Sequence, residues 1–370
     1  MKVEIFNLET GTEQTKPLAP VTEDSRYIGV SVPRGGIERL TQGLGQYIDD
    51  IEIPRMVHVV FWRSPIAHMR INKIDSEVAK AMPGVVLVAT GHDIAKVCKP
   101  WVATLSHLVG MKSAPQYPLA LDRACWQGEP VVAVVAETRA QAEDALQFIQ
   151  VDYDELPVAV NMEAALNAET PVIHPELGDN LCFTRSLDIG EVDRVFNEAD
   201  AVAEATMEFG RHTGVTLEPR GQIAHWNPAE QKLTVHHSFQ APHMMQDLYG
   251  RQFDLPAHAI RVICKDVGGS FGIKVHAYPD DFATVALSIM LGRPVKFMAD
   301  RLESFTSDIH ARHHLVKGRI AVNKDGEILG FDMYDLTGIG PYSMFPRTSA
   351  IEGNQVVNLV GGPYKHKHYR

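Results

Sequence analysis

Short apolar runs alternate with amphipathic and polar segments along the first 160 residues. β-branched and aromatic residues dominate 56–64, and two almost wholly apolar runs of strand length follow at 85–90 and 130–137. Runs of this length and composition are typical of buried strands. The acidic segment 151–157, which ends at a proline, predicts an edge strand.

Two helices are predicted between these strands. The segment 76–82 is followed by a Pro-Gly stop signal, and apolar residues recur at helical spacing over 138–149. Thr138 and Gln141, three residues apart, match a capping box at the start of the second helix. Strands and helices in this order predict an α/β first domain over 37–160, which ends in a proline-bearing, acidic segment.

Strands dominate the rest of the chain. The segment 200–209 alternates apolar and polar residues, and 313–336 contains two such runs joined by an Asn-Lys-Asp-Gly turn, a strong hairpin signal. A clear helix is predicted over 279–291, with proline and two acids in its first turn and a glycine after its end. These patterns predict a mixed α+β second domain over 161–370, and an α+β fold class for the whole chain.

The first 36 residues are polar and aperiodic, and we interpret them as an N-terminal arm that either packs on a partner or is a flexible lead-in. The 370 residues include 45% apolar and 22% charged residues, as in folded proteins of two or three domains. A net charge of −11 without a basic stripe argues against binding of nucleic acid or of an acidic membrane surface. No signal segment and no run of about 18 apolar residues is present, so a cytoplasmic protein is expected.

No metal site is predicted from ligand spacing. His310, His313 and His314 form a cluster without a carboxylate at ligand spacing, and we assign no metal to them. The cysteines are far apart, form no C-x-x-C pair, and are expected to be reduced and buried: Cys98, Cys125, Cys182 and Cys264.

A glycine-rich loop at 266–272 raises the question of a ligand. The next helix begins only at about Pro279, too late for a dinucleotide-binding fingerprint, and the spacing is not that of a phosphate-binding P-loop. Spacing alone indicates close backbone approach, to a ligand or to another strand, and favours a structural role. Gln240 lies between a strand and a proline turn, where its amide either faces a ligand at a domain rim or satisfies a buried backbone group. Glu218, beside Pro219 and Arg220, indicates an ion-paired turn.

Motifs that are weak singly follow one another in a fixed order. They are GLGQYIDD at 43–50, RSP at 63–65, EPVVAVVAE at 129–137, LEPR at 217–220, FQAPH at 239–243, DVGGSFG at 266–272 and DRLE at 300–303. In this order they resemble the molybdenum-binding large subunit of the xanthine dehydrogenase, aldehyde oxidase and carbon monoxide dehydrogenase family. The resemblance runs from about residue 37 to the end, and makes the first domain the hammerhead domain and the second the first part of the molybdopterin-binding domain.

The resemblance implies site residues and cofactors. Gln240 would lie beside the apical oxo group of molybdenum, as the catalytic residue of this chain. The cofactor would be molybdopterin with molybdenum, in the cytosine dinucleotide form that bacterial members usually carry. The loop residues implied to contact it are Gly268, Gly269, Ser270, Phe271 and Gly272.

The chemistry implied is hydroxylation of an aldehyde or an N-heterocycle with oxygen drawn from water, with two electrons passed to [2Fe-2S] clusters and FAD. The chain has no ligands for either relay, so an iron–sulfur subunit and an FAD subunit are implied as partners. Val275 occupies a position where purine-oxidising members commonly have a carboxylate, which makes a xanthine-type substrate less favoured; carbon monoxide stays open.

Length is the main departure from the family. Its large subunits are about twice as long, and neither their Ala-Tyr-Arg cofactor loop nor their glutamate base is found in this chain. We therefore expect either a large subunit split between two polypeptides or a fragment, in both cases inactive without a second chain. The alternative is a non-catalytic assembly or cofactor-carrying protein with the same fold.

Overall fold

The computed structural model describes residues 2–6, 13–17, 31 and 35–370, which fall into two units, 1–45 and 46–370. In the first unit, β1 (Lys2–Phe6) and β2 (Glu13–Pro17) pair antiparallel, and α1 spans Ile37–Thr41. Most of the predicted N-terminal arm lies outside the described residues, and its role stays a prediction.

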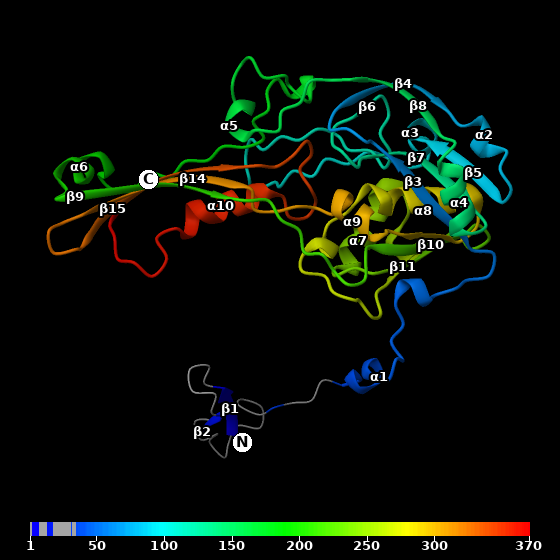
Figure 1. The fold of residues 1–370 in the computed structure, drawn as a ribbon, viewed down its shortest axis with the longest axis horizontal. Helices are drawn as coiled ribbons and strands as arrows, with labels where there is room; N and C mark the ends of the chain where they lie inside the picture. Colours follow the sequence, from blue (N-terminus) through cyan, green and yellow to red (C-terminus); the bar gives the residue numbers. More distant parts are fainter. Residues whose placement is uncertain (1, 7–12, 18–30, 32–34) are drawn as a thin grey trace. The chain divides into compact units, whose positions relative to one another are not determined.

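A seven-stranded sheet forms the centre of the second unit, in the order β12-β11-β10-β13-β3-β7-β5 (Figure 1). Its strands are β3 (Val57–Arg63), β5 (Val85–Thr90), β7 (Pro130–Ala136), β10 (Gly221–Asn227), β11 (Lys232–His237), β12 (Ile260–Ile263) and β13 (Val295–Met298). Strands from both predicted domains meet where β13 pairs parallel with β3, so one sheet runs through both. The predicted boundary near residue 160 stays a prediction.

Both faces of this sheet are covered. Along β7, Ala133 and Val135 face one apolar core, while Val132 and Val134 face the other. A strand buried on both sides needs a continuous apolar run, which explains the sequence of β7. The first core includes side chains of α7 (Pro242–Phe253) and α8 (Pro279–Leu291), and the second includes those of α4 (Arg139–Leu146).

Two smaller sheets flank the central one. A three-stranded sheet has the order β6-β4-β8, and a four-stranded sheet has the order β16-β15-β14-β9. Figure 1 shows β9, β14 and β15 running side by side away from α7 and α8. The strands are β4 (Met69–Asp75), β6 (Arg123–Ala124), β8 (Gln150–Glu155), β9 (Ala201–Phe209), β14 (His314–Val322), β15 (Ile328–Thr337) and β16 (His368–Tyr369).

Short helices complete the second unit. The α-helices are α2 (Glu77–Lys80), α3 (Gly91–Ile94), α5 (Met162–Ala165), α6 (Val192–Glu198), α9 (Arg301–Ser307) and α10 (Ser349–Leu359). The 3₁₀ turns are η1 (Ile48–Asp50), η2 (Pro175–Leu177), η3 (Ala257–Ala259) and η4 (Ile273–Val275). No helix among the described residues is long and apolar enough to cross a membrane.

Most sequence predictions of elements are confirmed. The capping box of α4 is present: the Gln141 amide donates to Thr138 Oγ1 at 3.3 Å, and the Thr138 amide donates to Gln141 Oε1 at 3.1 Å. The helix α8 ends at Gly292 in the left-handed conformation, φ 60°. The predicted hairpin is β14–β15, and 151–157 contributes the edge strand β8. The predicted helices 76–82 and 138–149 are shorter in the structure, and the α+β fold class is confirmed.

Candidate functional site

The glycine-rich loop 266–272 connects β12 to η4 and turns sharply. Gly269 has φ 98° and Gly272 has φ 91°, in the left-handed region that glycine adopts without steric cost. Phe271 also has a positive φ, 46°, which is uncommon for a bulky residue, and strain of this kind clusters at ligand-binding sites. The Phe271 side chain is 76% exposed, so burial in an apolar core does not account for its conformation.

Four successive main-chain amides of this loop are free to bind a ligand. The N–H groups of Gly269, Ser270, Phe271 and Gly272 donate to no acceptor within the described part of the chain. The Ser270 hydroxyl is buried and also has no partner there. A buried hydroxyl normally has a partner, and the four residues that carry the free N–H groups are partly or fully exposed, so a ligand can reach them. A row of such donors suits an anionic ligand.

A buried cluster, which we call the Glu218 cluster, fixes the start and end of this loop. It consists of Glu218, Ser238, Lys274 and the Gly268 amide. Glu218 Oε2 accepts hydrogen bonds from Ser238 Oγ at 2.5 Å, from the Gly268 amide at 2.7 Å and from Lys274 Nζ at 3.0 Å. Lys274 Nζ also donates to Ser238 Oγ at 2.8 Å. One carboxylate therefore joins the turn after β11, the glycine loop and η4. The ion-paired turn predicted at Glu218 is confirmed.

The members of this cluster are buried and closely packed, so other residues would not fit in their places. Lys274 is fully buried, and burial lowers the pKa of its ammonium group, while the Glu218 carboxylate opposes that effect. A Cβ atom on Gly268 would lie 2.4 Å from Cβ of Glu218, so a larger residue would push the loop away from the carboxylate. From sequence spacing we expected only a turn at Gly268. The structure shows that this position needs glycine because of its contact with Glu218.

Gln240 lies beside the same loop. The main-chain N–H of Gln240 donates to the carbonyl of Lys274 at 2.9 Å, which joins the backbone of Gln240 to η4. Its side chain is exposed and makes no hydrogen bond with any described residue, so it does not satisfy a buried backbone group. A side-chain amide that carries both donors and an acceptor is thus available next to the free N–H groups.

Arg220, two residues after Glu218, belongs to a second buried ion network. Arg220 contacts Asp280 at 2.7 Å and Asp308 at 2.5 Å, and Arg63 contacts Asp280 at 3.1 Å and Glu303 at 2.6 Å. Burial would raise the pKa of Asp280, but the two guanidinium groups outweigh it and hold the pKa below its ordinary value. The network links β3 to α8 and α9.

Sequence reasoning assigned the acid pair at 280–281 to a helix N-terminus, and this is half of its role. The Tyr278 amide donates to Asp281 Oδ2 at 3.0 Å, as expected of a helix cap. Asp280 instead belongs to the buried network. Its arginine partners are far away in the sequence, and no local signal could identify them.

One histidine of the predicted cluster, His314, is hydrogen-bonded to a carboxylate. His314 Nδ1 lies 2.9 Å from Asp335 Oδ1, and this hydrogen bond raises the pKa of His314. The β14–β15 pairing brings Asp335 near His314, a hydrogen-bond partner that ligand spacing along the sequence does not show. In the part of the chain that is described, no three His, Cys, Asp or Glu side chains are placed to hold a metal ion. All four cysteines are free; Cys98 and Cys125 are buried, and the other two are partly buried.

Comparison with known proteins identifies the family and the fold. A family model for the molybdopterin cofactor-binding domain matches residues 173–370. A second model, for the aldehyde oxidase and xanthine dehydrogenase a/b hammerhead domain, matches residues 42–157. These matches define a protein with a hammerhead domain and a molybdopterin cofactor-binding domain. The chain belongs to the molybdenum-binding large subunits of the xanthine dehydrogenase, aldehyde oxidase and carbon monoxide dehydrogenase family, of which it matches the N-terminal portion.

Relatives are much longer than this chain. The large chain of carbon monoxide dehydrogenase from Hydrogenophaga pseudoflava is 34% identical over 85% of this chain and 38% of its own length. The large subunit of nicotine 6-hydroxylase from Paenarthrobacter nicotinovorans is also 34% identical, over 90% of this chain and 40% of its own length. The structure of quinoline 2-oxidoreductase from Pseudomonas putida 86 has a TM-score of 0.89 and 35% identity, covering 92% of this chain and 43% of the other.

The residues present fit the cofactor. Molybdopterin carries a phosphate, and the four free amides and the unpartnered Ser270 hydroxyl are donors suited to anionic oxygen. Gly272 fits as well, because a Cβ there would point into open space where a ligand can approach the backbone.

Proposed function

We propose that this chain is part of a molybdenum hydroxylase that oxidises an aldehyde or an N-heterocycle. The observation that carries the proposal is the loop with four unpartnered amides, held by the Glu218 cluster next to the free side chain of Gln240. When bound, the molybdenum cofactor supplies the two-electron oxidation, with oxygen derived from water.

The chain's own residues bind and orient the cofactor. The amides of 269–272 and the Ser270 hydroxyl donate to its anionic oxygens, and the Phe271 ring shields one side of it from water. The Gln240 amide is proposed to hydrogen-bond an oxygen ligand of molybdenum. The cytosine dinucleotide form of molybdopterin is proposed here, because its additional phosphate would use further donors of this kind.

The rest of the site is proposed to come from polypeptide that corresponds to the part of the relatives that this chain does not match. The chain spans about 40% of the length of the curated relatives, and we call the polypeptide that matches their remaining length the complementary portion. It is proposed to bring the other cofactor loop and the base that activates the water. Iron–sulfur and FAD subunits are proposed as electron acceptors, in keeping with relatives named as chains of multi-subunit enzymes.

An N-heterocycle is the favoured substrate class. Two similar proteins act, by their names, on quinoline and nicotine, both of which contain a nitrogen ring. Val275, which is partly buried, offers no hydrogen bond to the polar edge of a purine. Both points favour a less polar ring than xanthine.

The test is the Gln240→Ala substitution in the assembled enzyme, assayed with quinoline, nicotine and an aldehyde and an artificial electron acceptor. The exposed side chain of Gln240 makes no contact that folding needs, so the fold should be unchanged and kcat should fall by about tenfold or more. Gln147→Ala, at an exposed position after α4, is the matched control and should leave kcat unchanged. Equal turnover in the two variants would remove Gln240 from the site.

A further inference from the structure

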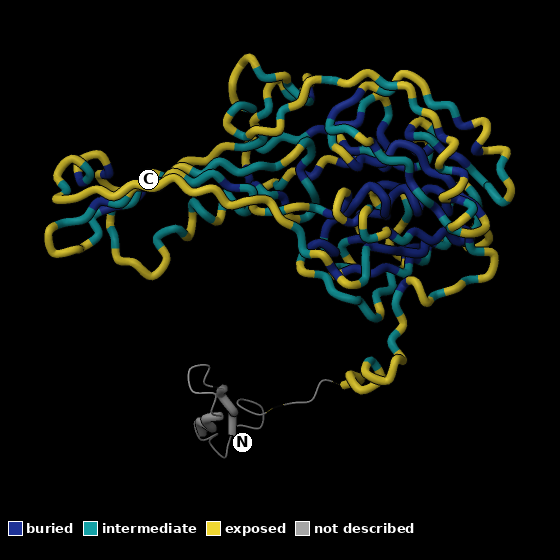
Figure 2. Tube along the Cα trace, in the orientation of Figure 1, coloured by how far each residue is buried: buried dark blue, intermediate teal, exposed yellow. Residues whose placement is uncertain are grey.

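The strand β9 presents an unprotected sheet edge. It pairs with β14 on one side and, in the described part of the chain, with no strand on the other. All nine of its residues are exposed, as Figure 2 shows along this part of the sheet. Sheet edges are normally shortened, bent by bulges, charged or covered, because their free backbone groups pair with other strands. The β9–β14 pairing runs from Phe209 to Ala201 without a break in register.

One face of β9 is apolar over its whole length. Ala203, Ala205, Met207 and Phe209 alternate onto this face, and Met207 and Phe209 are 59% and 55% exposed. The face continues onto β14, whose Val316 and Ile320 stand opposite Met207 and Ala203 and are only partly buried. Side chains of α10 and the segment after it cover β15 and reach β14 at His314, where Glu352 lies 3.7 Å away, while Met207 and Phe209 stay exposed. An exposed apolar patch beside a free edge marks a protein interface.

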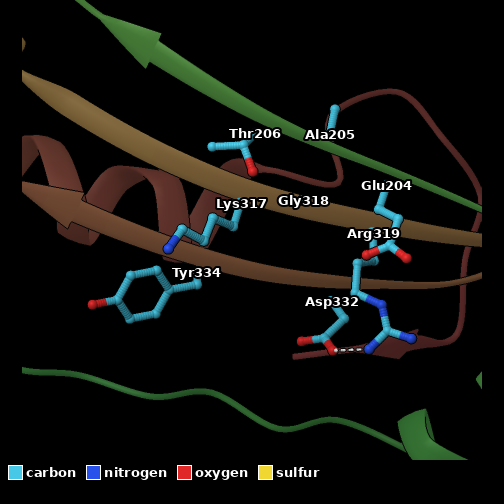
Figure 3. Close-up of a pocket in the computed structure, with 8 residues that line it drawn as sticks. All are labelled: Glu204, Ala205, Thr206, Lys317, Gly318, Arg319, Asp332 and Tyr334. Atoms are coloured by element: carbon cyan, nitrogen blue, oxygen red, sulfur yellow. Dashed lines mark hydrogen bonds and ion pairs between the residues drawn. The ribbon is translucent and has the colours of Figure 1, made fainter.

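The opposite face of the same strands is polar and hollowed. A pocket of about 440 Å³ lies on it. Its lining residues, drawn in Figure 3, are Glu204, Ala205, Thr206, Lys317, Gly318, Arg319, Asp332 and Tyr334. Arg319 pairs with Asp332 at 3.4 Å, and Lys317 pairs with Glu163 at 2.9 Å. Glu204 forms no ion pair with any described residue, although Arg319 stands opposite it on β14, so the outer row of this face carries a carboxylate. A strand added beyond β9 would therefore meet apolar groups on one face and a negative charge on the other.

We propose that this β9 surface, residues 201–209 with Val316 and Ile320, binds the complementary portion through an added β-strand. The proposal rests on the proposed function. The added strand alternates apolar side chains, which pack on Ala205, Met207 and Phe209, with basic or polar ones, which face Glu204. Main-chain hydrogen bonds provide affinity and the alternating side chains provide specificity, as in other cases of strand addition.

The length of the relatives selects this occupant. More than half of each relative lies outside the match, and it is by far the largest polypeptide that the family adds to this fold. A strand of nine residues reaches roughly 30 Å at about 3.3 Å per residue, so the surface suits a long element of a domain rather than a short peptide. A second copy of this chain would place Glu204 opposite or near another Glu204, which disfavours self-pairing.

Photo-cross-linking in the native complex tests the proposal. p-Benzoylphenylalanine replaces Met207 in one preparation and Val109, an 89% exposed residue outside the β9 surface, in another. After irradiation, mass spectrometry should find the Met207 probe joined to a peptide of the complementary portion, and the Val109 probe not joined to it. Cross-links from position 207 to a second copy, to an iron–sulfur or FAD subunit, or to residues 2–41 of the same chain would overturn the proposal. So would their absence, or equal cross-linking from both positions.

Amide hydrogen exchange provides a second measurement that does not depend on the probe. Amide exchange within 201–209 should be at least about tenfold slower in the native complex than in the 370-residue chain alone, because the added strand forms main-chain hydrogen bonds along the free edge of β9. Equal exchange would overturn the proposal. Molybdenum content measured on the same complex separates the two claims: cross-linking without molybdenum contradicts the proposed function alone, and molybdenum without cross-linking contradicts the β9 surface alone.

Discussion

Replacing Lys274 with methionine tests whether the Glu218 cluster holds the glycine-rich loop 266–272 in place. The substitution removes the ammonium group 3.0 Å from Glu218 Oε2 and fills most of its space with an apolar side chain. The Glu218 side chain is only 10% exposed, so its carboxylate would keep three donors, from Ser238, Gly268 and Ile48, and lose its counter-charge. Removing one partner of a buried ion pair costs about 3–5 kcal/mol. Because burial already disfavours the Lys274 charge, we expect about 3 kcal/mol, at the low end.

Amide exchange at Gly268 is the direct assay, since its N–H donates to Glu218 Oε2 at 2.7 Å. If the loop opens locally, a loss of about 3 kcal/mol makes exchange about a hundredfold faster, at 1.36 kcal/mol per tenfold change. The double variant Lys274→Met with Glu218→Gln has no buried charge and should recover all but about 1 kcal/mol. Lys80→Met is the control, because its 2.8 Å pair with Glu77 is exposed and contributes less than about 0.5 kcal/mol. The reasoning is refuted if Lys274→Met changes exchange no more than Lys80→Met does, or if the double variant is as unstable as the sum of the single ones.

Three further predictions concern other parts of the molecule. Gly268→Ala should lower the stability of the chain by about 1–3 kcal/mol in a denaturation assay, because its Cβ would lie 2.4 Å from Glu218. The control Gly318→Ala, whose Cβ would have no atom within 4 Å, should have little effect, and equal losses from the two substitutions would contradict the prediction. Burial raises the pKa of Glu129 from 4.5 to about 7, so the folded chain binds a proton that the unfolded chain has lost between those values. The free energy of unfolding should therefore fall by about 3 kcal/mol as the pH rises from 4.5 through 7, at 1.36 kcal/mol per pKa unit, and the Glu129→Gln variant should lack this fall; the same slope in both would exclude Glu129. Arg220→Met should destabilise the chain by about 3–5 kcal/mol, because Asp308 and Asp280 are buried beside it, and a loss below about 1 kcal/mol in urea unfolding would show that the network is dispensable.

Local patterns predicted the elements well because each depends on neighbouring residues. The capping box at Thr138, the glycine after α8 and the turn between β14 and β15 act within a few residues of the chain. The alternation of β9 likewise predicted a strand, although it could not tell that the strand would lie at an exposed edge. Edge or centre is decided by which strands pair, and those partners lie far away in the sequence.

The site shows the same division. Gln240 and the glycine loop were found through motifs in a fixed order, while spacing alone favoured a structural turn. The partner of Glu218 could not be predicted, because Lys274 reaches it only through strand pairing. Glu218 precedes β10, which pairs antiparallel with β11, and β11 pairs parallel with β12, the strand before Lys274. The contact between Asp335 and His314 could not be predicted for the same reason. Contacts across a sheet become visible only when the strand register is known.

Metal and nucleotide analysis of the native complex tests the central claim most directly. The complex is purified with its partner chains, its molybdenum is measured by mass spectrometry, and acid hydrolysis releases the nucleotide of the cofactor. The account predicts about one molybdenum per chain together with cytidine monophosphate, iron and FAD. A pure complex that contains the partner chains but no molybdenum would contradict it, and would leave a non-catalytic protein built on the same fold.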